Sequence, residues 1–315
     1  MSQDVEFHPP IPPDLVVKQK GGRGRGKARS QGAVGGWMVA PAAVLLLIFI
    51  IVPVALTFTL AFTDAKLVSP EPAKFIGLDN FTRIFSDETF WKSLRNTLIF
   101  GIVVVPVQAG LALVLALLIN VKIKGVNFFR TVYFLPVVTS IVVVSIIWGF
   151  MYQPTGLING LLSNFGIQGP DWLGQTNTAL FSIIVLSIWQ AVGFHMIIWL
   201  SGLQTISPSL YEASGIDGAS NWQQFRFVTW PGLRQTRTFI LVTITISALA
   251  LFSQVNILTQ GGPQDATTTV VFQAVRTGYQ QQQTGVASAI SLIFFVLVLI
   301  VSIVQRYLTR DKDAR

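Results

Sequence analysis

Residues 96–121 read NTLIFGIVVVPVQAGLALVLALLINV, a stretch of 26 residues that contains no charged side chain. A charge at the centre of a bilayer costs roughly 2.5–3.5 kcal/mol on insertion scales, so spanning helices occupy such charge-free stretches. This one exceeds the roughly 20 residues that a helix needs to cross the hydrocarbon core. Its apolar residues run on without the alternation expected of membrane β-strands. The stretch therefore predicts a transmembrane α-helix.

Five further charge-free windows are long enough for the same purpose. They cover residues 30–63, 131–170, 172–211, 238–264 and 277–305. Within the six windows we expect spans at about 37–62, 97–120, 132–152, 179–200, 238–259 and 286–307. The sequence thus predicts an all-α membrane protein with six transmembrane helices.

The overall composition supports a membrane protein. Of the 315 residues, 51% are apolar and only 11% are charged, whereas soluble domains carry about 25% charged residues. The chain has no cysteine, so it forms no disulfide and offers no thiolate to a metal. We expect one membrane domain at 36–310. A basic tail at 1–35, rich in Pro and Gly and expected to be disordered, precedes it, and a short C-terminal tail at 311–315 follows.

The distribution of Lys and Arg predicts the orientation. Sixteen of the 22 basic residues fall in the N-terminal tail, in the second and fourth loops and at the C-terminal end, which share one side of a six-span topology. The positive-inside rule therefore places both termini and loop 201–237 in the cytoplasm. The basic cluster at 18–29 favours contact with membrane lipid over nucleic acid, because it is tethered beside a bilayer whose anionic lipids attract such clusters.

The same tail contains an incomplete phosphate-binding motif. Residues 21–28 follow the pattern GxxxxGK, but Ala28 stands where that loop needs a Ser or Thr for magnesium. The segment also joins no strand to a helix. We therefore expect no nucleotide and no other cofactor to be bound by this chain.

Loop 201–237 predicts two short helices joined by a glycine turn. Ser207-Pro208 is a helix start signal, because a hydroxyl N-cap precedes a proline at the first helical position. We expect this helix to run to about Asp217 and to end where Gly218 takes a left-handed turn. Residues 220–223, Ser-Asn-Trp-Gln, have capping-box spacing for a second helix, which Pro231 is expected to stop.

The spacing within this loop resembles a motif of ABC importer membrane subunits that grips the ATP-hydrolysing subunit. That motif reads Glu-Ala-Ala, three residues, Gly, nine residues, Ile, any residue, Leu-Pro. Four positions match it in type and register, namely Glu212, Ala213, Gly218 and Pro231. Three positions replace its Ala, Ile and Leu, namely Ser214, Val228 and Trp230. The alternative is that the loop is an ordinary helical hairpin that binds no partner. By the resemblance, the ATPase-coupling residues are Tyr211, Glu212, Ala213, Ser214, Ile216, Asp217, Gly218, Ala219 and Pro231.

Three other segments resemble the carbohydrate branch of these importers. They are residues 75–81 (FIGLDNF), 258–263 (LTQGGP) and 285–289 (GVASA). The resemblance implies the type I ABC importer permease fold and a non-enzymatic permease of the bacterial cytoplasmic membrane. Its substrate would be a sugar such as a disaccharide.

The same resemblance implies the partners and the mechanism. The partners would be a second homologous permease, two ATPase subunits that use ATP and magnesium, and an extracytoplasmic sugar-binding protein. Closure of the ATPases would draw the two coupling loops together and switch the core from inward-open to outward-open. The alternatives are a permease for a polyamine or an inorganic anion and, more remotely, an ion-coupled secondary transporter. The latter would need intramembrane carboxylates, and the predicted spans contain no Asp or Glu.

Polar and aromatic residues inside the spans are candidates for the substrate path, because polar groups in a membrane bundle tend to face its interior. The candidates are Trp148, Tyr152, Gln190, His195, Phe252, Ser253, Gln254, Asn256, Ser288 and Ser291. The alternative for each is a hydrogen bond between helices, or an aromatic ring at the membrane interface. For His195 a hydrogen bond is favoured over a metal, because no second ligand is near it in the sequence. We expect no metal site.

Overall fold

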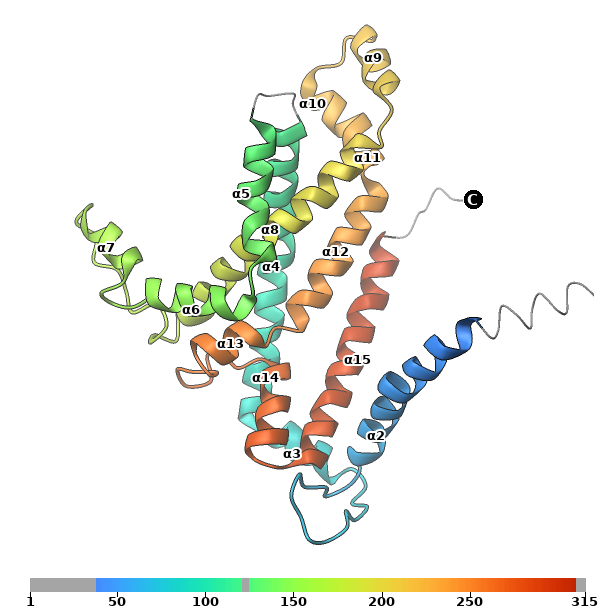
Figure 1. Ribbon diagram of the computed structural model, residues 1–315, viewed down its shortest axis with the longest axis vertical. Helices are drawn as coiled ribbons and strands as arrows, with labels where there is room; N and C mark the ends of the chain where they lie inside the picture. Colours follow the sequence, from blue (N-terminus) through green and yellow to red (C-terminus); the bar gives the residue numbers. More distant parts are fainter. Residues whose placement is uncertain (1–37, 121–124, 310–315) are drawn as a thin grey trace, which may run out of the picture. The chain divides into compact units, whose positions relative to one another are not determined.

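The computed structural model describes residues 38–120 and 125–309, and most of them lie in helices. The α-helices are α2 (Val52–Leu60), α3 (Asp79–Ser86), α4 (Glu88–Asn120), α5 (Val126–Val138), α6 (Ile141–Met151), α7 (Leu157–Ser163), α8 (Ala179–Gln204), α9 (Pro208–Ile216), α10 (Asn221–Gln224), α11 (Trp230–Gly232), α12 (Arg234–Leu249), α13 (Ser253–Leu258), α14 (Val270–Val275) and α15 (Thr284–Thr309) (Figure 1). Three π-helical turns join them, η2 (Leu47–Ile51), η3 (Phe225–Thr229) and η4 (Arg276–Gln280). The chain divides into two compact units between Ala55 and Leu56. The predicted tails at 1–35 and 311–315 lie outside the described residues.

Five helical segments among the described residues are long and apolar enough to cross a membrane. They are Met38–Leu60, Glu88–Asn120, Ala179–Gln204, Arg234–Leu258 and Thr284–Tyr307. A sixth span results if α5 and α6 are counted together, although their axes differ by 98°. The six predicted spans fall on these segments, and the all-α membrane fold is confirmed.

The sequence did not indicate that the third predicted span, at 132–152, is broken into two helices. Thr139 and Ser140 leave the helical region with ψ angles of 141° and 129°, and this extended pair separates α5 from α6. The pair interrupts a long apolar run that has no charge and whose single glycine, Gly149, lies well after the break, so hydropathy alone predicts one helix. A second break, at residues 250–252, separates α12 from α13 inside the span predicted at 238–259.

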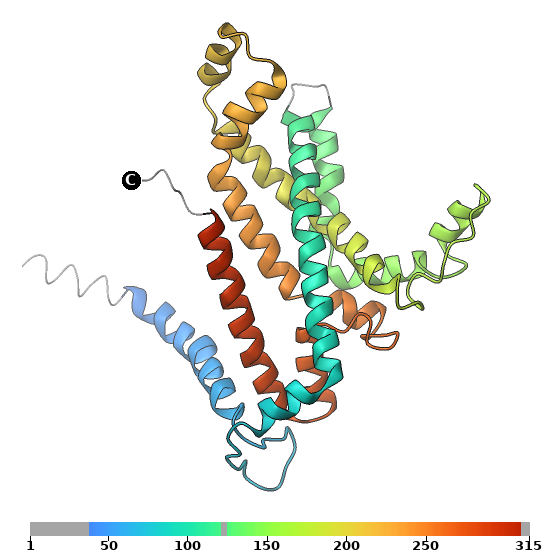
Figure 2. The ribbon, with the colours of Figure 1, turned by 180° about the vertical axis from the view of Figure 1, so that it is seen from behind.

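The core of the second unit forms where α4, α8 and α12 pack together, and Figure 2 shows these helices from behind. Small residues let the helices approach closely, as in other membrane bundles. Ala112 and Ala116 of α4 are fully buried, and a Cβ on Gly193 of α8 would collide with the backbone carbonyl of Tyr133 in α5. Trp199 of α8 donates its indole N–H to the Ala109 carbonyl at 3.1 Å. Helix α4 therefore forms a fixed frame against which α8 packs.

A buried polar network closes the end of the unit that contains α3 and α14. Asn96 of α4 donates to the carbonyls of Asp265 and Thr268 at 2.9 and 3.0 Å, and Ser93 donates to Gln273 at 2.7 Å. From the sequence we also expect a short helix after Gly77, capped by Asp79 or Asn80, and this helix is present as α3. The expected cap is wrong, because Leu78 is the N-cap and Asn80 instead donates to the Ala61 and Thr63 carbonyls.

Candidate functional site

The segment between α8 and α12 forms a helical knob, residues 207–232, at one end of the second unit (Figures 1 and 2). Its first helix, α9, starts after Ser207 with Pro208 in the first turn, as the sequence predicts. The hydroxyl of Ser207 does not cap the helix, because it pairs with the hydroxyl of Ser209 at 2.8 Å. Gly218, with φ of +77°, ends the helix in the left-handed conformation that was predicted.

The second part of the knob begins with the predicted capping box. The Ser220 backbone N–H donates to Gln223 Oε1 at 2.7 Å, and the Gln223 backbone N–H donates to Ser220 Oγ at 3.4 Å. The predicted stop at Pro231 is off by one residue, because the helix ends at Gly232. The helical path continues from α10 through η3 into α11, which contains Pro231, and it turns at Leu233, a non-helical residue that is fully buried.

The outer surface of the knob is apolar and carries unpaired acidic groups. Ile216 is 88% exposed, Phe227 is 68% exposed and Trp222 is 67% exposed. Within the part of the chain that the structure describes, Glu212 and Asp217 are exposed and have no ion-pair partner. Exposed apolar groups gathered beside unpaired charge are typical of a surface that binds another protein.

One contact joins the two halves of the knob, a second joins the knob to α12, and a third packs α12 against α8. The hydroxyls of Tyr211 in α9 and Thr229 in η3 lie 2.9 Å apart, which joins the two halves of the knob. The guanidinium of Arg237 in α12 lies 4.4 Å from the ring centroid of Trp230, a cation–π contact. Below the knob, a Cβ on Gly202 of α8 would collide with the side chain of Thr236 in α12. These contacts connect the knob to α12, and α12 to α8.

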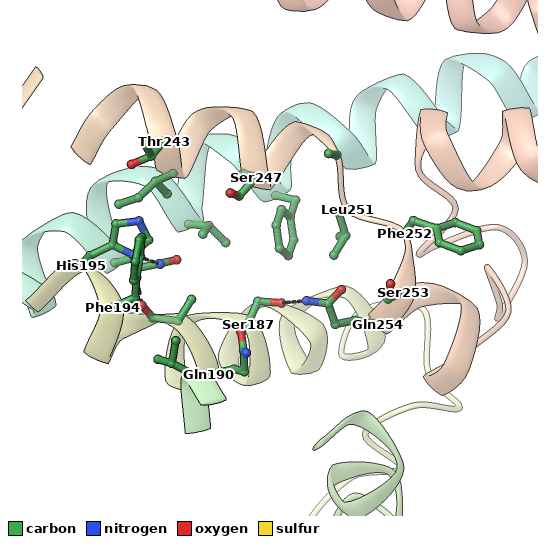
Figure 3. A pocket seen from close by; sticks show the side chains of 18 residues that line it. Ser187, Gln190, Phe194, His195, Thr243, Ser247, Leu251, Phe252, Ser253 and Gln254 are labelled. Atoms are coloured by element: carbon green, nitrogen blue, oxygen red, sulfur yellow. Dashed lines mark hydrogen bonds between the residues drawn. The ribbon is translucent and has the colours of Figure 1, made fainter. Parts of the chain in front are cut away.

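The same two helices line a cavity of about 290 Å³ together with α4, α5 and α13, and its wall contains both polar and apolar side chains (Figure 3). This volume is close to the lower limit of roughly 300 Å³ for small-molecule sites. Its polar lining residues are Gln108, Ser187, Gln190, His195, Thr243, Ser247, Ser253 and Gln254. Its apolar lining residues include Phe100, Phe194, Leu251 and Phe252. Amides and hydroxyls that alternate with apolar surface suit a solute that carries many hydroxyl groups.

Hydrogen bonds fix several of these side chains. Gln108 Nε2 lies 2.9 Å from His195 Nδ1, and Gln254 Nε2 donates to Ser187 Oγ at 3.5 Å, which joins α13 to α8. Gln190 Nε2 donates to the Pro136 carbonyl of α5 at 3.4 Å. The break between α12 and α13 places Ser253 and Gln254 beside the α8 side chains, because the chain leaves the α12 axis at Ala250.

Half of the predicted path residues meet in this cavity. They are Gln190, His195, Phe252, Ser253 and Gln254. The sequence analysis did not name Gln108, Ser187, Thr243 and Ser247, which also line it. The same rule, a polar residue inside a predicted span, applies to all four. Ser and Thr on their own are weak signals, since they commonly bond to their own helix, as Ser187 does to the Ile183 carbonyl.

The structure places the other predicted path residues elsewhere. Trp148 and Tyr152 belong to an aromatic cluster with Trp172 and Trp189, and the Tyr152 hydroxyl donates to the Ser182 carbonyl at 2.8 Å. Asn256 is exposed on α13. Two further candidates on α15 line a separate hollow of about 240 Å³, namely Ser288 and Ser291. Their part in a substrate path stays a prediction.

Apolar spans around a cavity with several polar side chains, joined to a knob that projects beyond them, are consistent with a membrane transport subunit. Residues 108–313 match the family described as binding-protein-dependent transport system inner membrane component. The chain belongs to this family, and its knob and most of the cavity residues lie within the matched range.

Two curated relatives and one solved structure are similar over most of their length. The chain is 34% identical over 286 residues to a lactose transport system permease of Rhizobium radiobacter, which covers 89% of this chain and 95% of the relative. It is 36% identical over 269 residues to a trehalose/maltose transport system permease of Thermococcus litoralis, covering 85% and 90%. A chain of a bacterial alginate ABC transporter, in complex with an alginate pentasaccharide-bound periplasmic protein, matches with a TM-score of 0.79. It is 26% identical, with coverage of 90% and 96%. These similarities confirm the predicted type I importer permease fold.

Proposed function

We propose that this chain is the permease subunit of an ATP-driven importer that moves a carbohydrate, of about disaccharide size, across the bacterial cytoplasmic membrane. The names of the relatives support this substrate class, since both similar permeases serve sugar transport systems. The excess of Lys and Arg on one side supports an orientation with both termini and the knob in the cytoplasm. The chain itself is a transport subunit and not an enzyme.

The partners belong to the same proposal. An extracytoplasmic sugar-binding protein delivers the substrate, a role supported by the periplasmic protein in the alginate transporter complex. A second, homologous permease completes the path, and two ATPase subunits bind ATP and magnesium. This chain supplies the docking surface, which consists of the exposed residues of α9 and the glycine turn. Membrane lipid surrounds the spans.

The position of the knob between α8 and α12 carries the proposal. The α8 helix leads into α9, and α11 leads into α12, so the knob connects two helices that both line the cavity. When the ATPases close on ATP, they displace the knob. The Tyr211–Thr229 and Trp230–Arg237 contacts pass this displacement to α12, and the close Gly202–Thr236 packing couples α12 to α8. The cavity walls then move relative to the α4 frame, which changes the side from which the cavity is open.

The cavity chemistry argues against the alternative substrates. A polyamine needs carboxylates and an inorganic anion needs cations, because an unpaired charge is costly to desolvate. None of the 18 residues that line the cavity is Asp, Glu, Lys or Arg. An ion-coupled transporter would also need a titratable carboxylate in the spans. Hydroxyl and amide groups instead suit a sugar, which donates and accepts hydrogen bonds around its ring.

Copurification tests the coupling assignment. Gly218→Trp places a large side chain on the knob, where no atom of the described residues lies within 4 Å of the added Cβ, so the side chain is directed at a docked partner, at the cost of backbone strain from the φ of +77°. Gly77→Trp is the matched control, because Gly77 also has positive φ, of +63°, and open space around it, but lies outside the knob. We expect Gly218→Trp and Glu212→Lys to lose the copurifying ATPase and uptake while they remain in the membrane, and Gly77→Trp to keep the ATPase. ATPase retention by both knob variants would exclude this docking surface.

Uptake by the complete transporter tests the substrate class. Cells that express the native subunits are supplied with labelled maltose, trehalose and lactose, and in parallel with a labelled polyamine and labelled phosphate. Uptake of a sugar that requires the chain supports the proposal. Uptake of only the polyamine or phosphate would overturn it.

A further inference from the structure

The polar side chains that line the cavity between α8 and α12 carry no charge, apart from one imidazole that can take up a proton. A sugar as substrate does not by itself require this. The hydrogen-bonding side chains of the cavity lie in two facing rows, with Ser187, Gln190 and His195 on α8 and Thr243 and Ser247 on α12 (Figure 3). Ser253 and Gln254 of α13 also line the cavity, and Gln254 lies beside the α8 row, where it donates to Ser187 Oγ at 3.5 Å. Every member of both rows is an uncharged amide or hydroxyl, except the imidazole of His195. The cavity can therefore bind hydroxyl groups but offers no lysine or arginine to an anion.

The charged residues nearest along the lining helices do not reach the cavity. Among the described residues of α8 there is no Asp, Glu, Lys or Arg. On α12 the nearest cation is Arg237, six residues before Thr243, which corresponds to about 9 Å along a helix axis, and it lies over the Trp230 ring. On α5 the cation is Arg130, seven residues or about 10 Å before the lining residue Val137. On α4 the nearest cation is the exposed Arg95, five residues or about 7.5 Å before the lining residue Phe100. None of these three arginines lines the cavity.

His195 is the one lining residue that could become a cation, and its ring is already engaged. Nδ1 lies 2.9 Å from Gln108 Nε2 and 3.1 Å from the Ala191 carbonyl, and the residue is 4% exposed. The Gln108 amide N–H can donate to Nδ1 only when that nitrogen carries no proton. The Ala191 carbonyl accepts from Nδ1 when that nitrogen is protonated. The imidazole therefore acts as a hydrogen-bonding group.

We propose that the path through this permease admits uncharged sugars and rejects sugars that carry a carboxylate, sulfonate or phosphate. An anionic group enters a site with no opposite charge only at a large desolvation cost. On membrane-insertion scales such a cost corresponds to a discrimination on the order of 100-fold. The similar proteins do not decide whether charged sugars are excluded, because they include permeases for lactose and for trehalose/maltose as well as a transporter of alginate, an acidic polysaccharide.

The inference rests on the proposed function, and site-specific labelling tests it independently of uptake. The chain contains no cysteine, so Ser247→Cys introduces one reactive thiol into the cavity wall of this subunit. The complete transporter, purified with its native partners in lipid nanodiscs, is treated with an uncharged maleimide. The mass of this subunit reports the rate of modification. Ser253→Cys is a second variant of the same wall, and Ser86→Cys on the exposed end of α3 is the control.

Matched pairs of probes give the comparison. Maltose and trehalose are each compared with the counterpart in which one C6 hydroxymethyl group is oxidised to a carboxylate. We expect at least one neutral sugar to slow modification at position 247 or 253, and its carboxylate counterpart to need about 100-fold more concentrated solution for the same effect. Neither sugar should change modification at position 86.

Two outcomes would overturn the inference. One is protection by the carboxylate counterpart at the same concentration as the neutral sugar. The other is the absence of protection by any probe in both cavity variants, since the cavity would then not hold the sugar. In either case uptake of labelled sugar by the complete transporter would leave the proposed function standing, whereas loss of sugar uptake would overturn the proposed function itself.

Discussion

Gln108 Nε2 lies 2.9 Å from His195 Nδ1, and both side chains are buried where α4 meets α8 beside the cavity. The bond links the fixed frame of the unit to the helix that leads into the knob. It joins two residues that are 87 positions apart, so its presence depends on the packing of the helices.

Gln108→Leu tests the contribution of this bond. The change keeps a side chain of similar size and leaves the imidazole with only the Ala191 carbonyl of its own helix. Interhelical hydrogen bonds in membrane proteins contribute about 0.6 kcal/mol on average and up to about 1.7 kcal/mol, so we expect the free energy of unfolding to fall by roughly 0.5–2 kcal/mol. Thermal unfolding of the purified complex measures the change. Gln175→Leu, at an exposed position outside α8, is the control, and an equal loss there would contradict a specific role of the bond.

Gly193→Ala should disrupt the packing of α5 against α8. The added Cβ collides with the Tyr133 carbonyl, a backbone group that cannot rotate away. Overpacking of this kind costs about 1–3 kcal/mol. Gly110→Ala on α4 is the matched control, because no atom lies within 4 Å of its added Cβ and Ala is the better helix former. Unfolding midpoints should therefore move down for Gly193→Ala and remain or rise for Gly110→Ala. The same shift for both variants would show that the α5–α8 contact is loose.

The membrane spans could be predicted from the sequence because the cost of a buried charge is local to each residue. The stretch at 96–121 needed no knowledge of its neighbours, and it forms the main part of α4. The capping box at Ser220 and Gln223 was also predictable, since both partners lie within one helical turn. The break at Thr139 and Ser140 was not, because nothing in the residue types forbids a continued helix there.

The candidate site, too, could be predicted from the sequence only in part. Gln190, His195 and Gln254 could be chosen because polar side chains are unusual in a span. Which of the candidates share a cavity could not be chosen, because that depends on how α12 and α13 bend around α8. Trp148 and Phe252 were both candidates as aromatic residues inside predicted spans. Phe252 lines the cavity, whereas Trp148 packs on Tyr152 and Trp189. The residue types identify the polar and aromatic candidates, and the packing of the helices decides which of them line the cavity.

Asn96→Ala should loosen the loop between α13 and α14. The Asn96 amide donates to two carbonyls of that loop, Asp265 and Thr268, and the substitution leaves both without this donor. A buried group without its partner costs roughly 1–3 kcal/mol. We expect faster hydrogen exchange of the backbone amides at residues 266–270 in the purified transporter. Asn120→Ala, at the exposed opposite end of α4, should leave this exchange unchanged. Unchanged exchange in Asn96→Ala would mean that other bonds, such as Val270 N–H to Thr97 Oγ1, suffice to hold the loop.

Ser220→Ala and Ser207→Ala distinguish two N-cap positions of the knob that look alike in the sequence. Ser220 accepts a hydrogen bond from the Gln223 backbone N–H, whereas Ser207 makes no such bond and pairs with Ser209. Loss of a capping side chain costs about 0.5–2 kcal/mol of helix stability. We therefore expect Ser220→Ala to increase hydrogen exchange across residues 221–229 and to weaken ATPase copurification, and Ser207→Ala to have a much smaller effect. Ser220→Asp, which keeps a capping oxygen, should restore both measurements. If Ser220→Asp fails to restore them, or if Ser207→Ala is equally damaging, the capping box does not determine the order of the docking surface.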